Sequence, residues 1–146
     1  MSASAAVLLA DAAGAALAIQ NAIMVAVVDR GVGFIGTLII NSTIGLVVLA
    51  AIETIRSGPG FAVDIITRAK PWFVLPGLLG TFFVFAGVFG YRQLGAATTI
   101  VLIVAAQLAM GIALDAMGLT VGARPIGMQM LLGAALLVTG AWLVVR

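Results

Sequence analysis

Residues 71–91 read PWFVLPGLLGTFFVFAGVFGY and contain no charged side chain. A helix of about 20 apolar residues crosses the hydrocarbon core of a bilayer, which is about 30 Å thick. A helix is suited to this environment because it satisfies its own backbone hydrogen bonds. Trp72 and Tyr91 mark the two ends of the stretch, as aromatic side chains do at membrane surfaces. We therefore predict a transmembrane helix.

Four more apolar stretches fill most of the remaining chain. The five predicted spans are 5–28, 33–55, 71–91, 96–119 and 126–145. Hydrophobic residues make up 64% of the sequence and charged residues 8%, whereas a soluble domain has about 25% charged residues. We therefore predict an all-α integral membrane protein, with residues 1–146 forming a single transmembrane domain of five helices.

The longest predicted loop separates the second span from the third. A Gly-Pro-Gly segment at 58–60 breaks the helix. Residues 61–69 then mix apolar side chains with Asp64 and Arg68. This pattern is typical of a short helix that lies in the membrane interface.

Side-chain chemistry excludes several classes of function. Cysteine and histidine are absent, which removes thiolate and imidazole catalysis and the usual zinc sites. No nucleophile–base pair is visible, so we predict that the protein is not an enzyme and has no cofactor or metal site. The net charge is only +2 and the basic residues form no patch, so we predict no nucleic-acid partner.

Basic residues are almost evenly divided between the two membrane surfaces. With five spans the termini lie on opposite sides. The N-terminal side, called side A here, carries Arg56, Arg68, Lys70 and Arg124, and side B carries Arg30, Arg92 and Arg146. An excess of basic residues marks the cytoplasmic side of a membrane protein. Two interpretations fit equally: the chain inserts both ways and pairs with an inverted copy, or it sits one way with side A cytoplasmic.

Glycines recur at seven-residue intervals in two spans, at Gly80 and Gly87 and again at Gly133 and Gly140. Small residues on one stripe allow membrane helices to approach closely. We predict that the glycines of the third span pack within the bundle. For the fifth span, a contact with a second chain is an equally good interpretation.

Carboxylates inside the predicted spans are costly to bury and are usually functional. Asp11 is roughly 9 Å deep, at about 1.5 Å per residue, and has no basic neighbour in the sequence. Asp115 lies close to the end of its span, and Glu53 precedes Arg56 by one turn. We take Asp11 and Asp115 as candidate proton-coupling residues and give Glu53 a structural role. The alternative for both aspartates is an interfacial carboxylate without a function in transport.

Uncharged amides lie deeper in three of the spans. Counted from side B, Asn21 and Asn41 are about 10–12 Å deep, with Gln20 beside Asn21 and Gln107 somewhat deeper. A polar layer near the midplane is typical of a transporter's binding site, so these four amides are the candidate substrate-binding residues. The alternative is interhelical hydrogen bonding that only holds the bundle together.

Several motifs match the order and spacing of a known family. They are Gln20-Asn21, Asn41-Ser42 with Gly45, Pro71-Trp72, Pro76 to Gly80, Tyr91, Leu94 to Thr99, Gln107, Asp115 with Gly118, and Gly133 to Trp142. Together they resemble the YdcZ-like family, a five-helix branch of the drug/metabolite transporter superfamily in bacterial inner membranes. The resemblance covers nearly the whole chain and is most specific from Pro71 to Gly118. Residues 133–141 are also similar to the final helix of the small multidrug resistance proteins.

The resemblance implies a fold and a function that the residue patterns alone do not. Larger superfamily members contain two inverted five-helix halves, so this chain resembles one half. It would complete the fold as an antiparallel homodimer or with a related five-helix partner chain. The implied activity is secondary active export of a small polar, cationic or toxic metabolite, often coupled to protons. Asp115 matches the family pattern, and Asp11 does not.

Two other functions remain compatible with the sequence. A small dual-topology ion channel has a similar size and charge balance, although its four-helix plan does not fit five spans. A non-transporting subunit of a heterodimeric membrane complex would use the amides and glycines for assembly only.

Overall fold

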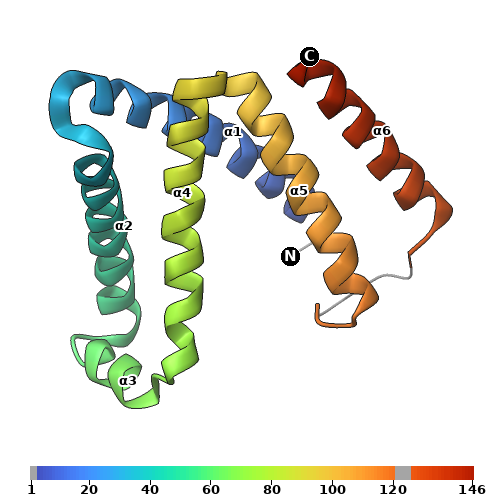
Figure 1. The fold of residues 1–146 in the computed structure, drawn as a ribbon. Coiled ribbons are helices and arrows are strands. Elements are labelled where there is room, and N and C mark those ends of the chain that lie inside the picture. Colours follow the sequence, from blue (N-terminus) through green and yellow to red (C-terminus); the bar gives the residue numbers. More distant parts are fainter. Residues whose placement is uncertain (1–2, 121–125) are drawn as a thin grey trace. The chain divides into compact units, whose positions relative to one another are not determined.

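A computed structural model describes residues 3–120 and 126–146, and these residues are all-helical (Figure 1). The long helices are α1 (Ala3–Val27), α2 (Gly33–Ser57), α4 (Val74–Leu94), α5 (Ala96–Ala116) and α6 (Met128–Val145). A shorter helix, α3 (Phe61–Arg68), lies between α2 and α4 in the sequence. The predicted all-α class is confirmed.

The connection between α1 and α2 is a kink rather than a loop. Within Val28–Val32 the backbone leaves the helical conformation at Gly31, which has φ 96°, and Gly33 follows with φ 75°. Such backbone angles are accessible to glycine because it has no Cβ. The stretch Ser4–Ser57, one of four described stretches long and apolar enough to cross a membrane, therefore comprises two helices, α1 and α2. Figure 1 shows the chain turning at this kink.

The helix ends differ from the predicted spans by a few residues. α5 stops at Ala116, ahead of position 119, because the chain leaves the helix through Gly118, which has φ 66°. α2 continues to Ser57 and ends where Gly58, at φ 81°, donates its N–H to the Thr54 carbonyl over 2.9 Å. Arg124, counted above among the side-A charges, lies outside the described residues.

The segment predicted to lie in the membrane interface forms α3. Pro71–Phe73 makes a single 3₁₀ turn that leads into α4. α3 contacts α2. Its place at the membrane surface stays a prediction.

The described residues divide into two compact units. One unit is Ile19–Phe89, and the other combines Gly90–Arg146 with the N-terminal residues up to Ala18. The division cuts α1 and α4, so each of these helices contributes a segment to both units.

The core of the Ile19–Phe89 unit lies near the kink. Met24, Val28, Leu38 and Val88 bury their side chains together. Three phenylalanines pack with ring centroids 6.0–6.1 Å apart: Phe34, Phe85 and Phe89. These contacts join the second half of α1, the start of α2 and the later part of α4.

The other unit is organised around a tight turn between α4 and α5. Gly95, at φ 82°, separates the two helices. Thr99 is buried, and its hydroxyl donates a hydrogen bond to the Gly95 carbonyl over 2.8 Å. Farther along, α5 packs beside α6 (Figure 1).

Large apolar side chains cover much of the surface of the long helices. Leu8, Ile44, Leu79 and Leu136 are each 60% exposed or more. Such a surface is unsuited to water and is satisfied by lipid or by another apolar chain. The exposure pattern therefore agrees with a multi-pass membrane protein.

Candidate functional site

An amide pair joins α1 and α2. Gln20 Nε2 donates a hydrogen bond to Asn41 Oδ1 over 2.7 Å, and both side chains are half-buried. Gln20 precedes Gly31 by 11 residues and Asn41 follows it by 10. Residues at nearly equal distances from a turn reach similar depths, so the kink at Gly31 brings the two amides together. The sequence placed both residues in one layer, and the structure adds the bond between them.

Asn21 lies next to this pair in the sequence but in a different environment. Its side chain is 3% exposed. Its buried Oδ1 accepts no hydrogen bond from any residue that the structure describes. Consecutive helical residues point about 100° apart, which separates the Asn21 amide from the Gln20–Asn41 pair. Asn21 instead lies one turn before Met24, at the edge of the apolar core.

Gly87 of α4 provides the space that the Asn21 amide occupies. A Cβ at Gly87 would lie 3.0 Å from Asn21 Nδ2 and 3.3 Å from Oδ1. Both distances are shorter than ordinary van der Waals contact, so alanine would displace the amide. Sequence analysis placed Gly87 on a packing stripe, but it did not predict that the stripe meets a candidate binding residue.

The remaining candidate residues belong to the other unit. Gln107 on α5 and Asp11 on α1 are exposed. Asp115 is half-buried at the end of α5, where its carboxylate accepts a hydrogen bond from the Thr120 hydroxyl. The structure therefore brings Gln20 and Asn41 into direct contact and places Asn21 beside Gly87. These residues belong to the Ile19–Phe89 unit, whereas Asp11, Gln107 and Asp115 belong to the other unit.

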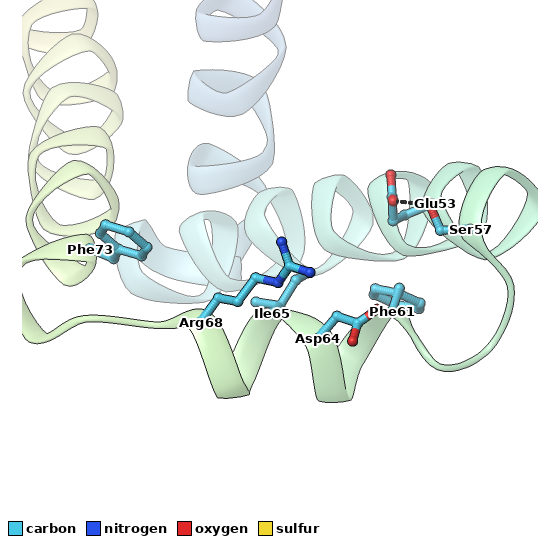
Figure 2. Close-up of a pocket in the computed structure, with 7 residues that line it drawn as sticks. All are labelled: Glu53, Ser57, Phe61, Asp64, Ile65, Arg68 and Phe73. Carbon is cyan, nitrogen blue, oxygen red and sulfur yellow. Dashed lines mark hydrogen bonds between the residues drawn. The ribbon is translucent and has the colours of Figure 1, made fainter.

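A pocket that sequence analysis missed lies between α2 and α3 (Figure 2). Its volume is about 400 Å³, and its lining residues are Glu53, Ser57, Phe61, Asp64, Ile65, Arg68 and Phe73. Glu53 Oε1 accepts a hydrogen bond of 2.5 Å from the Ser57 hydroxyl, a partner one helical turn away that spacing alone could have suggested. The pocket lies at the predicted membrane surface, away from the amide pair in sequence.

A second pocket is an apolar groove between α5 and α6. Its volume is about 370 Å³, and it is lined by Ile100, Val101, Val104, Leu137, Gly140, Ala141 and Val144. Gly140 lines this groove and Gly133 does not, and a Cβ at either glycine would meet nothing within 4 Å. Neither glycine of the seven-residue spacing is therefore in a close helix contact within the single chain.

No group of three or more carboxylates comes together as a metal-binding cluster among residues 3–120 and 126–146. The chemistry that the described site offers is hydrogen bonding by amides within an apolar surround.

Comparison with known proteins gives one family and one relative. The family model described as "Putative inner membrane exporter, YdcZ" matches residues 5–143. The inner membrane protein YdcZ of Escherichia coli (strain K12) is 38% identical over 141 residues, which is 92% of this chain and 91% of the relative. No solved structure matches the chain significantly.

Proposed function

Because the chain belongs to the YdcZ family of inner membrane exporters, we propose that it is a secondary active transporter that exports a small polar or cationic solute. Its location is the inner membrane, which it crosses several times. The proposed export activity is supported by the description of the family. The nature of the solute and the working assembly are inferred from the residues.

The amides of α1 and α2 are the observation that supports solute binding. Gln20 and Asn41 hydrogen-bond across the two helices, and Asn21 is buried beside Gly87. Polar groups are costly in the hydrocarbon region, where water is scarce. Amides at this depth suit a binding site in which they exchange hydrogen bonds with each other for hydrogen bonds to a solute.

The proposed working form is an antiparallel homodimer, which would complete a pair of inverted halves. The nearly even division of basic residues between the two surfaces supports insertion in both orientations. Exposed polar side chains on the spans, at Asp11 and Gln107, support it as well, because such groups usually face a cavity or a partner. A related five-helix chain of opposite orientation would meet the same requirement.

A panel of candidate solutes tests transport directly. Proteoliposomes that contain this chain alone are exposed to small ammonium, guanidinium and neutral polar solutes on a solid-supported membrane. We expect saturable currents for at least one solute and exchange of labelled for unlabelled solute. Currents that rise linearly with concentration, without exchange, would identify a channel instead.

Proton coupling is proposed to involve Asp11 and Asp115. In wild-type proteoliposomes we expect an imposed pH gradient to accelerate solute flux, because a carboxylate that binds a proton in one state can release it in the other. Asp11→Asn and Asp115→Asn together should abolish this acceleration while leaving downhill exchange. Asp64→Asn, on α3 outside the spans, is the matched control. An undiminished response to the pH gradient in the double variant would rule out both acids.

A further inference from the structure

The buried amide of Asn21 has one atom that the described structure leaves without a partner. Its Oδ1 is covered by protein and accepts no hydrogen bond from the described residues. Buried polar atoms are paired in the great majority of cases, and each exception calls for an explanation. The cost of an unpaired acceptor is high in a membrane span because little water is present to compensate for it.

The neighbouring amide does not supply the missing donor. Gln20 Nε2 donates to Asn41 Oδ1 over 2.7 Å and makes no hydrogen bond to Asn21 Oδ1. The buried side chains nearest along the chain, Met24 and Val28, are apolar. Across from Asn21, Gly87 presents only backbone, and its neighbour Val88 is 1% exposed and apolar.

The contact with Gly87 also offers a route by which a solute reaches this atom. No side chain at Gly87 interlocks α4 with Asn21, although a Cβ there would lie only 3.0 Å from Nδ2. The oxygen is covered in the conformation described here. Separation of α1 and α4 beside Gly87 would uncover it, and would also part the buried cluster of Met24, Val28 and Val88.

The apolar segments of this unit carry no positive charge that would oppose a cationic ligand. No basic residue lies in the apolar segments 19–28, 33–55 or 71–89. An anion at Asn21 would therefore lack a counter-charge on these segments, which is costly in the membrane. A protonated amine would meet no like charge there, and its N–H group would form a charge-assisted hydrogen bond with the amide oxygen.

We propose that Asn21 Oδ1 is the acceptor that selects substrates carrying a cationic N–H group, and that Gly87 keeps the space for it. The inference rests on the proposed transport function and names a substrate class for the same site. The Gln20–Asn41 pair is a positioning contact in this arrangement. Protonated primary and secondary amines are preferred over quaternary ammonium ions, which have the same charge but no N–H.

The test uses benzylammonium and benzyltrimethylammonium, which share an aromatic body and a positive charge and differ in N–H donors. Binding and flux of both probes are measured in proteoliposomes of the full chain. We expect wild type to prefer benzylammonium by about tenfold, which is the effect of one hydrogen bond worth about 1.4 kcal/mol. Asn21→Leu keeps the branched shape and removes the acceptor. This variant should bind and transport the two probes about equally.

Gly87→Ala provides a second variant in case Asn21→Leu does not fold. Its methyl group displaces the Asn21 amide and should also lower the preference. Gly80→Ala on the same helix is the control, because a Cβ there would meet nothing within 4 Å, and it should retain the wild-type preference.

The outcomes separate this inference from the proposed function. Flux with equal affinity for both probes, or a preference that survives Asn21→Leu and Gly87→Ala, would overturn the role of Asn21 and leave transport intact. Binding that depends on Asn21 without flux would support the site and contradict the transporter. If wild type neither binds nor transports benzylammonium, the assignment to protonated amines is overturned.

Discussion

We expect Gly90→Ala to destabilise the turn between α4 and α5 by about 1–3 kcal/mol, the usual cost of overpacking a tight contact. The new Cβ would lie 2.6 Å from Thr99 Cγ2 and 2.9 Å from Thr99 Oγ1. Thr99 is 4% exposed, and its hydroxyl is held by the Gly95 carbonyl. Since this side chain has little freedom to move, the backbones of α4 and α5 must separate. SDS-induced or thermal unfolding in detergent micelles measures the change.

Thr99→Ala tests whether this contact causes the loss. It removes both atoms that approach the new Cβ most closely, so Gly90→Ala should cost much less in this background. The coupling between the two substitutions should be about 1–2 kcal/mol, as for other residues in direct contact. Gly80→Ala, on the exposed part of the same helix, should not reduce stability. Equal losses in the two backgrounds would show that Thr99 is not the obstacle.

The second large effect is expected at Gln20. Gln20→Leu removes the donor to Asn41 Oδ1 and should lower the free energy of unfolding by about 1–3 kcal/mol, because it strands a polar atom in an apolar surround. The bond itself contributes less, about 0.6 kcal/mol for an interhelical hydrogen bond in a membrane protein. The stranded acceptor therefore dominates the change. Unfolding of the reconstituted or micellar chain reports it.

A double substitution distinguishes the stranded atom from a general packing defect. Gln20→Leu with Asn41→Leu removes both partners, which is often nearly neutral, and should recover most of the lost stability. A double variant that is less stable than Gln20→Leu alone would contradict this explanation. Asn21→Leu, at the next position, should not cause this kind of stability loss, because the Asn21 oxygen accepts no hydrogen bond from the described residues.

Position along each helix could be predicted from the sequence, whereas rotation about the helix axis could not. Residue number sets height at about 1.5 Å per residue, and Gln20 and Asn41, predicted at similar heights, do form a hydrogen bond. The rotation of α1 decides that Gln20 meets Asn41 and that Asn21 faces α4. Hydrophobic periodicity gives little help because these helices are apolar on nearly every side.

The sequence also did not predict which glycines lie in close contact with a neighbouring helix. The seven-residue spacing of Gly80 and Gly87 predicts a packing stripe, but a Cβ at Gly87 would meet Asn21 while one at Gly80 would meet nothing within 4 Å. Gly90 lay outside that spacing, and its contact with Thr99 depends on the tight turn at Gly95. These differences arise from the relative rotation of the packed helices, which a stripe of glycines does not specify.

The pocket between α2 and α3 was missed for a related reason. The sequence predicts both the break after Arg56 and a short amphipathic helix, but it does not show that the two helices pack together. The contact between α3 and α2 creates the pocket, in which Ser57 donates a hydrogen bond to Glu53. A short helix after a Gly-Pro-Gly break can fold back onto its predecessor, which local patterns do not reveal.

We propose that two copies of this chain with opposite orientations form the transporter. The most direct measurement fuses a cytoplasmic and, separately, a periplasmic reporter after Arg146 and compares their activities in cells. We predict activity from both reporters, because the basic residues give almost no orientational bias. Activity from one reporter alone would show a single orientation and would contradict the antiparallel homodimer.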